Sequence, residues 1–229
     1  MGSALLIRHG QASFGAEDYD KLSALGEQQS RELGRWLKQT GQQPDLIVVG
    51  TMQRHLRTAE LCVKAAGVAA PQLTLEQLDE LDHVEIVARY RPDFSSFAAM
   101  RAELAASADS RRAFQQLFAA AIARWTSGEH DGEYTRSWPV FRERVLHGLQ
   151  TLAAYQARTI WAFTSGGPIA VIANTLVGVP ADNPFVLSWP LVNTSLTRVA
   201  LGGNRHSLVS YNSWPHLELT GDPRLVTHR

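Results

Sequence analysis

The sequence contains a single cysteine, Cys62, in 229 residues. An intrachain disulfide is therefore impossible, as is usual for proteins of a reducing compartment. Cys62 lies in an apolar helical pattern with no acid–base partner beside it, so we interpret it as a buried structural thiol rather than a nucleophile. An excess of charge of one sign is also lacking, because 22 Lys and Arg balance 22 Asp and Glu. This balance argues against a broad nucleic-acid or membrane-binding surface but is compatible with a small basic pocket.

Targeting segments and long uninterrupted hydrophobic runs are scarce as well. The N-terminal apolar run is too short for a signal peptide and lacks a basic leader. Residues 159–181 carry no charge and are long enough to span a bilayer, but Ser165-Gly166-Gly167-Pro168, Asn174 and Pro180 interrupt them. We interpret this segment as strand, turn and helix, and we predict a cytoplasmic protein. No tight cluster of side chains has metal-ligand spacing, so we expect no metal and no cofactor.

What the chain does have is a large apolar fraction, 45%, which is enough for a buried core. Continuous apolar runs at residues 4–7, 46–49 and 159–163 are bounded by turn residues, a pattern typical of strands buried on both faces of a parallel sheet. Helical patterns follow each run, at residues 25–38, 51–66 and 169–176. We therefore predict an α/β fold, a three-layer sandwich with a mostly parallel central sheet.

Residues 84–158 break this alternation, and we predict that they form a helical cap inserted into one domain spanning 1–229. A helix is expected to start at Ser137-Trp138-Pro139, where proline suits the first turn. Residues 195–200 and 207–211 are predicted to be closing strands. The apolar residues at helical spacing in the cap are Phe97, Met100, Leu104, Phe114, Leu117, Phe118, Ile122 and Trp125.

Polar residues follow the three apolar runs at the point where each predicted strand ends. Arg8 and His9 follow the first run, residues 51–54 the second, and residues 165–167 the third. Since open α/β sheets bind ligands beyond the carboxyl ends of their strands, we expect these residues to meet at one edge. Arginines, glycine-rich turns and helix N-termini favour an anion, above all phosphate. An imidazole at the centre of such a site can attack phosphorus directly.

Arg8-His9-Gly10 resembles the signature of the histidine phosphatase superfamily, in its phosphoglycerate mutase-like branch. Further motifs resemble that family in the same order along nearly the whole chain. They are Leu22-Ser23-Ala24-Leu25-Gly26-Glu27-Gln28-Gln29, Thr51-Met52-Gln53-Arg54-His55-Leu56-Arg57-Thr58-Ala59, Leu78-Asp79-Glu80, the pair Phe141 and Arg144, Asn193-Thr194-Ser195, and Asn212 through His216-Leu217.

The resemblance implies a role for each matching residue. His9 is the nucleophile that forms a phosphohistidine, and Arg8 and Arg54 clamp the transferring phosphoryl group and stabilise its charge. Glu80 is the general acid that protonates the leaving oxygen and then the base that activates water. Asp79, Asp82 and Glu85 lie in the same acidic segment and are the alternatives to Glu80. The resemblance requires no metal, and the cap favours a small phosphorylated substrate over a folded phosphoprotein.

The chain also departs from the family pattern near the expected phosphate pocket. Ser165 stands where relatives carry a second histidine, so a hydroxyl replaces a cationic side chain. The amides of Gly166 and Gly167 are expected to bind phosphate nonetheless. Gln11, which we also place in the pocket, stands where a glutamate is common, and Gly15 where mutase-like members often carry a phosphate-contacting asparagine.

These departures leave three hypotheses for the function. The first is a phosphatase acting on a small phosphomonoester, which the intact His9 and Glu80 favour. The second is a phosphoglycerate mutase, which Ser165 and Gly15 argue against. The third is a binding domain for phosphorylated ligands without turnover. For Ser165 itself, capping of a helix that begins near Pro168 is the structural alternative, and His55 is interpreted as a surface or structural residue.

Overall fold

The computed structural model describes residues 2–13, 20–94, 110–179, 185–203 and 205–228. The chain divides into two compact units. The first comprises Met1–Glu80 and Val145–Arg229, and the second comprises Leu81–Arg144. The insertion predicted over 84–158 therefore stays a prediction, and three of its apolar positions, Phe97, Met100 and Leu104, lie outside the described residues.

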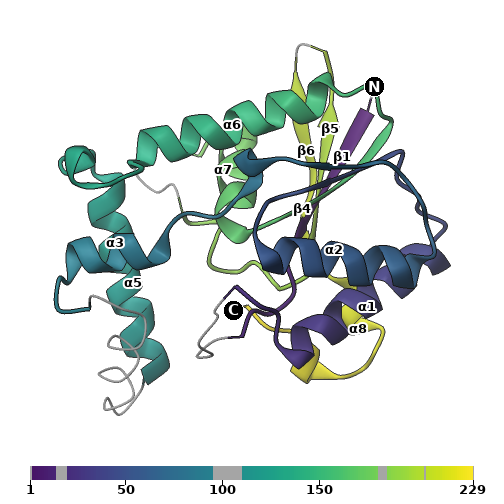
Figure 1. Cartoon of the computed structure of the whole chain (residues 1–229), viewed down its shortest axis with the longest axis horizontal. Helices are drawn as coiled ribbons and strands as arrows, with labels where there is room; N and C mark the ends of the chain where they lie inside the picture. The colour runs from purple at the N-terminus through teal and green to yellow at the C-terminus, as the bar shows by residue number, and fades with distance from the viewer. Residues whose placement is uncertain (1, 14–19, 95–109, 180–184, 204, 229) are drawn as a thin grey trace. The chain divides into compact units, whose positions relative to one another are not determined.

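The first unit contains a six-stranded sheet in the order β3-β2-β4-β1-β5-β6 (Figure 1). The strands β1 (Gly2–Arg8), β2 (Leu46–Val49), β3 (Gln72–Thr74) and β4 (Thr159–Thr164) are parallel. The strands β5 (Leu196–Leu201) and β6 (His206–Ser213) close the sheet in antiparallel orientation. The predicted α/β fold with a mostly parallel sheet is confirmed. Sequence patterning missed β3 because its three residues are exposed at the sheet edge and carry no apolar run.

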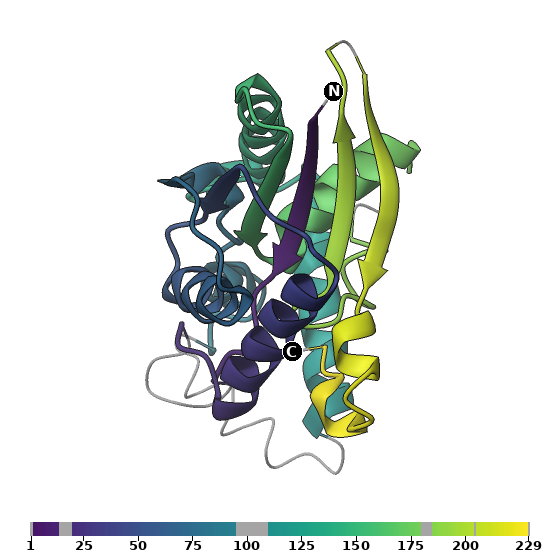
Figure 2. The ribbon, with the colours of Figure 1, turned by 90° about the vertical axis from the view of Figure 1, so that its right-hand side faces the viewer.

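Helices cover both faces of this sheet (Figures 1 and 2). Helices α1 (Ala24–Gln39) and α2 (Gln53–Ala66) pack on one face, where Leu33 and Cys62 join the core built on Trp161 and Phe163. Because side chains alternate along a strand, the intervening residues of β1 and β4 face the other way, where α7 (Gly166–Val177) packs against β1 and β6. Burial of Cys62 raises the pKa of its thiol, in accord with a structural role.

The longer elements among the described residues of the second unit are the helices α3 (His83–Tyr90), α5 (Ser110–Thr126) and the start of α6 (Trp138–Ala154). Its core is aromatic, because the ring centroid of Trp125 lies 5.5 Å from those of both Trp138 and Phe141. The Trp125 indole also donates to the carbonyl oxygen of Arg136 at 3.0 Å. Short 3₁₀ turns in the chain are Glu76–Leu78, Asp131–Glu133 and Pro223–Leu225, and a short helix α8 spans Pro215–Glu218. Over the described ranges, no helix combines the length and the apolar character needed to cross a membrane.

The contact between α1 and α2 depends on Gly34. A Cβ atom at this position would lie 2.2 Å from the Cys62 carbonyl oxygen and 2.7 Å from the Ala65 Cβ. Gly34→Ala should therefore push the helices apart, at a cost of about 1–3 kcal/mol beyond the small gain in helix propensity. We expect the melting temperature to fall by roughly 2–4 °C per kcal/mol lost.

The matched control is Gly132→Ala, where an added Cβ has no heavy atom within 4 Å among the described residues. This variant should melt like the wild type in the same calorimetric scan. An unchanged melting temperature for Gly34→Ala would contradict the close helix contact.

Candidate active site

The carboxyl ends of three neighbouring strands meet at one edge of the sheet. Arg8, the last residue of β1, pairs in register with Thr164, the last residue of β4. The His9 amide continues this pairing by donating to the Thr164 carbonyl oxygen at 2.9 Å, and the Gly50 amide after β2 donates to the Phe163 carbonyl oxygen at 3.1 Å. These backbone hydrogen bonds hold the polar residues that follow the strands at the same edge of the sheet.

The His9 imidazole is held in one tautomer. Its Nδ1 lies 2.7 Å from the Gly10 carbonyl oxygen. Since a carbonyl can only accept, Nδ1 carries the proton and Nε2 keeps its lone pair. Burial, followed by the nearby Arg54, Arg8 and His55, lowers the pKa of His9 well below its ordinary value. His9 is therefore a neutral imidazole whose Nε2 is able to act as a nucleophile at neutral pH.

The main chain of His9 is fixed by a strained turn from the C-terminal part of the chain. Thr194 has φ of 61°, a conformation that costs a β-branched residue energy. Its amide donates to the His9 carbonyl oxygen at 3.2 Å, and the Asn193 side-chain amide donates to the same oxygen at 3.2 Å. The Thr194 hydroxyl in turn lies 2.9 Å from Nε2 of the buried His216. Strain held next to a reactive side chain is typical of functional sites.

Two guanidinium groups provide positive charge around His9. Arg54 lies in the first turn of α2, is 3% exposed, and donates to the Asp20 carboxylate at 2.8 Å. Arg8 is half-buried and donates to the Leu191 carbonyl oxygen. Both arginines lower the pKa of His9, as positive charges near an imidazole do. Such a pair suits a phosphoryl group, whose charge is spread over several oxygens.

Glu80 lies at the start of α7, where its Oε2 accepts from the Gly167 amide at 3.1 Å. The other carboxylates of this acidic segment have structural partners. Asp79 accepts from the Thr51 amide and hydroxyl, Asp82 caps α3, and Glu85 accepts from Thr135. Glu80 and Asp79 both make contacts at the sheet edge, but Asp79 is bound by Thr51 through both carboxylate oxygens, whereas Glu80 Oε2 contacts the first turn of α7. The Gly167 amide is engaged by this carboxylate, and binding of phosphate by Gly166 stays a prediction.

Gly166 and Gln11 lie in well-packed surroundings. A Cβ atom at Gly166 would lie 3.7 Å from the Arg8 Nε, so the start of α7 is in van der Waals reach of that guanidinium. The side-chain oxygen of Gln11 accepts from the Ser23 hydroxyl at 2.8 Å, and its backbone amide donates to Gln29 at 2.8 Å. These contacts orient Gln11, whose role in substrate binding stays a prediction. Gly15 lies outside the described residues.

Ser165 is fully buried between β4 and α7. The helix begins at Gly166, earlier than predicted, and Ser165 is its N-cap residue by backbone position. The side chain makes no capping hydrogen bond, however, and its Oγ lies 2.6 Å from Nε2 of His55. The capping alternative for the Ser165 hydroxyl is therefore wrong, because an imidazole from α2 binds this hydroxyl instead.

His55 is the residue that sequence reasoning missed. Of its two interpretations from sequence, a surface histidine is wrong, because the side chain is fully buried, and its ring centroid lies 5.8 Å from that of His9. A signal for burial was present, since His55 falls on the same helical stripe as Ala59, Cys62 and Ala66. The contact with Ser165 could not be foreseen, because it joins residues 110 positions apart.

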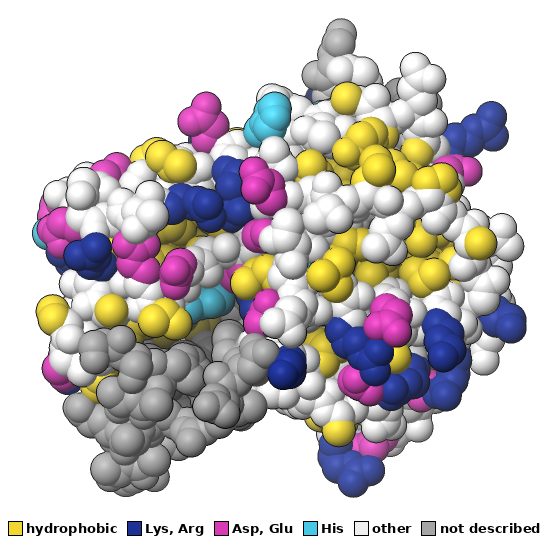
Figure 3. All heavy atoms as spheres, in the orientation of Figure 1, with side chains coloured by type: hydrophobic (Ala, Val, Ile, Leu, Met, Phe, Trp, Pro, Cys, Tyr) yellow, Lys and Arg dark blue, Asp and Glu magenta, His cyan; other side chains and the backbone are white. Residues whose placement is uncertain are grey.

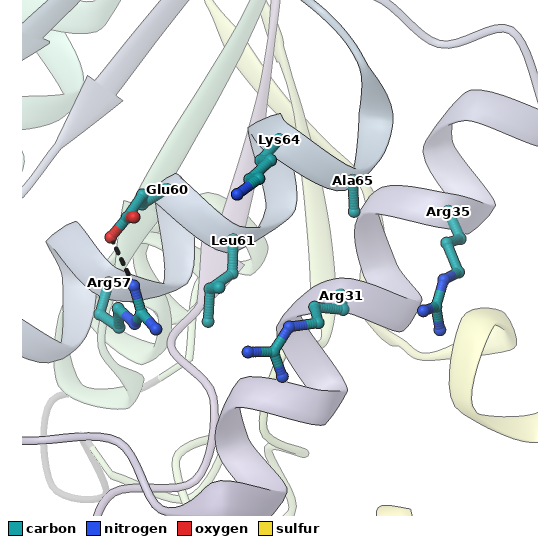
Figure 4. Close-up of a pocket in the computed structure, with 7 residues that line it drawn as sticks. All are labelled: Arg31, Arg35, Arg57, Glu60, Leu61, Lys64 and Ala65. Atoms are coloured by element: carbon teal, nitrogen blue, oxygen red, sulfur yellow. Dashed lines mark hydrogen bonds and ion pairs between the residues drawn. The ribbon is translucent and has the colours of Figure 1, made fainter.

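Another hollow lies away from the strand ends, on the outer side of α1 and α2 (Figure 4). Its arginines are engaged in ion pairs, since Arg57 pairs with Glu27 and Glu60, Arg31 with Glu27, and Arg35 with Glu32. On the face drawn in Figure 3, basic and acidic side chains are likewise mixed over these helices. Surface ion pairs of this kind are usual for helices and identify no binding site. The residues lining the hollow are Arg31, Arg35, Arg57, Glu60, Leu61, Lys64 and Ala65.

Comparison with known protein families identifies the superfamily of the chain. Residues 4–213 match the histidine phosphatase superfamily (branch 1). The match covers most of the chain, and the chain belongs to this superfamily. A curated relative, the 2,3-bisphosphoglycerate-dependent phosphoglycerate mutase of Thermobifida fusca, is 35% identical over 75 residues. That segment is 30% of this chain and 30% of the relative's length.

Solved structures of both phosphatases and mutases share the fold. A putative alpha-ribazole-5'-P phosphatase from Escherichia coli superimposes with a TM-score of 0.65 at 19% identity, covering 93% of this chain and 98% of that one. A mycobacterial glucosyl-3-phosphoglycerate phosphatase gives 0.61 at 18% identity, with coverage of 93% and 99%. A phosphoglycerate mutase from Bacillus anthracis gives 0.64 at 15% identity, with coverage of 96% and 97%. At these identities the similarity demonstrates the fold.

Proposed function

We propose that this protein is a phosphatase that hydrolyses a small-molecule phosphomonoester through a phosphohistidine intermediate on His9. The observation that carries the proposal is the fixed tautomer of His9, with Nδ1 bound to the Gly10 carbonyl and a neutral Nε2 beside two arginines. A buried imidazole without a proton on Nε2 cannot donate a hydrogen bond from this nitrogen to an anion. Its lone pair can, however, attack phosphorus.

In the first step, Nε2 of His9 attacks the phosphorus of the ester. The N–P bond forms as the P–O bond to the alcohol breaks, and the Glu80 carboxylic acid gives its proton to the leaving oxygen. Arg8 and Arg54 stabilise the negative charge on the phosphoryl oxygens while the phosphoryl group moves from the ester oxygen to His9. Asp20, which pairs with Arg54, must yield to the substrate as an alternative anion.

In the second step, the Glu80 carboxylate accepts a proton from water, and the oxygen attacks the phosphorus. The N–P bond breaks, inorganic phosphate leaves, and His9 returns to its neutral form. Glu80 thereby regains the proton that it lost, so the cycle closes without a cofactor. Its contact with the Gly167 amide holds the carboxylate at the start of α7 throughout.

A small substrate is favoured by the burial of the site. His9 is only 7% exposed and Arg54 3%. A phosphoryl group therefore reaches these side chains more easily when the rest of the substrate is small. Two of the structural neighbours are named as phosphatases of small molecules. Release of phosphate from a panel of phosphorylated metabolites identifies the substrate class.

Mutase activity is the second candidate, because the Thermobifida fusca relative that shares 35% identity over 75 residues is a phosphoglycerate mutase. The two activities differ in the fate of the phosphoryl group. A mutase returns it to the sugar-acid product, whereas a phosphatase passes it to water. Incubation with 3-phosphoglycerate and 2,3-bisphosphoglycerate, followed by separate quantification of 2-phosphoglycerate and free phosphate, distinguishes them.

Replacement of the nucleophile should abolish turnover. In His9→Ala no other atom takes the place of Nε2, so we expect hydrolysis of an aryl phosphate to fall on the order of 10⁴-fold or more. His147→Gln, at an exposed position in α6, serves as the control and should keep full activity. A folded His9→Ala protein with wild-type turnover would contradict the proposed function.

Replacement of the acid should depend on the leaving group. In Glu80→Gln the proton for the leaving oxygen is lost, so alkyl phosphomonoesters should slow by about 10²–10⁴-fold. Aryl phosphates with acidic leaving groups should slow much less and show an initial burst, because dephosphorylation of His9 becomes limiting. Asp82→Asn keeps the cap of α3 and is the control. Equal losses on both substrates without a burst would move the acid to another residue.

A further inference from the structure

Two buried imidazoles lie side by side in this site, and the assigned chemistry uses only one of them. The His55 ring is fully buried, and its centroid is 5.8 Å from that of His9. Its Nε2 is 2.6 Å from Ser165 Oγ, the side chain that follows β4 at the sheet edge. His55 thus reaches from the first turn of α2 to the position where the sheet edge presents a hydroxyl.

The other nitrogen of His55 faces a carboxylate. Nδ1 lies 3.6 Å from Asp79 Oδ1, and among the described residues no partner lies within hydrogen-bond distance of this nitrogen. Gly50 makes the arrangement possible, because a Cβ atom there would lie 2.2 Å from His55 Nδ1 and 2.6 Å from Asp79 Oδ1. A histidine that only filled the core would be expected to have both nitrogens satisfied.

The order Asp79, His55, Ser165 determines what the hydroxyl can do. If His55 is neutral with its proton on Nδ1, then Nε2 accepts from Ser165, and the Ser165 lone pairs face the site. A phosphoryl oxygen would be repelled by them. If His55 carries both protons, Nε2 donates to Ser165 Oγ, and the hydroxyl proton is available to the phosphoryl oxygen. The two states therefore differ in whether the site accepts an anion.

We propose that His55 and Ser165 act as one unit, in which protonated His55, facing Asp79, turns the Ser165 hydroxyl into a donor to the transferring phosphoryl group. The proposal rests on the proposed function of the His9 site. His55 is a positioning residue, since it acts on the ligand through Ser165. The positive charge in this unit comes from His55 in α2, rather than from a histidine in the loop after β4, and it acts through Ser165.

Anion binding and proton uptake are then coupled. Burial lowers the pKa of His55 in the free protein, an effect that Arg54 adds to and that Asp79 and Glu80 oppose. The His9 ring also lies near the pair, with its centroid 5.8 Å from that of His55. A bound dianion reverses this balance and raises the pKa. Between the two pKa values, binding takes up a proton, so affinity should fall as pH rises, by up to about tenfold per pH unit.

The test is isothermal titration of tungstate, a phosphate-shaped dianion, into the whole protein from about pH 6 to 8, the range in which histidine charge changes. Repeating it in buffers of different ionisation enthalpy counts the protons taken up. We expect about one proton per tungstate in the wild type. His55→Gln should remove this uptake, flatten the pH dependence and weaken binding about 10- to 100-fold, the usual effect of losing one charge-assisted hydrogen bond.

Ser165→Ala should have an effect similar to that of His55→Gln, and the double variant should be no worse than either single one, because the two side chains form one unit. The exposed His147→Gln is the matched control and should leave affinity and proton uptake unchanged. Thermal melting of each variant separates a loss of folding from a loss of binding. His55→Ala with Ser165→His places an imidazole directly at the edge and should restore part of the pH-dependent affinity.

Unchanged tungstate affinity and proton uptake in folded His55→Gln would overturn the proposal. Additive losses in the double variant, or a normal Ser165→Ala, would overturn the coupling between the two residues. These outcomes are independent of turnover. A wild-type protein that hydrolyses no phosphomonoester, or a fully active His9→Ala, would instead remove the proposed function on which the inference rests.

Discussion

The chemistry of the site depends on one hydrogen bond, between His9 Nδ1 and the carbonyl oxygen of the adjacent Gly10, at 2.7 Å. This bond decides which imidazole nitrogen holds the proton and therefore which one can attack. It needs a backbone that cannot rotate, and the pairing of the His9 amide with Thr164 and of the His9 carbonyl with Thr194 provides that restraint. The sheet and the strained C-terminal turn thus converge on a single residue.

The pKa values of the histidines in this site depend on burial and on the nearby cationic side chains. Burial, Arg54 and Arg8 lower the pKa of His9 and keep it neutral, as its proposed role as nucleophile requires. The same environment disfavours charge on His55, while the carboxylates of Asp79 and Glu80 oppose that effect. Asp20 balances Arg54 in the structure as it stands. In the proposed function, an arriving phosphoryl dianion replaces such balancing charges, and the proposed role of His55 couples its binding to protonation.

The sequence predicted the parts of the fold that follow from local patterning. The apolar runs at 46–49 and 159–163 became β2 and β4 because strands buried on both faces need continuous apolar residues. Strand β3 escaped notice because it is short and exposed. In the site, strand-end residues such as Arg8 and His9 were predictable from the ligand-binding rule for parallel sheets. The pairing of His55 with Ser165 was not, since it depends on how α2 packs beside β4 and leaves no trace in either local sequence.

The most direct test of the central claim is to locate the phosphoryl group in the trapped intermediate. The wild-type protein is mixed rapidly with an aryl phosphate and quenched in alkali, because phosphohistidine is labile in acid. Phosphorus NMR and peptide mass spectrometry then identify the modified atom. We expect phosphorylation of His9 at Nε2, the nitrogen that the Gly10 carbonyl leaves without a proton. Phosphate on Nδ1, on His55 or on Ser165, or rapid turnover with no covalent intermediate, would contradict the account.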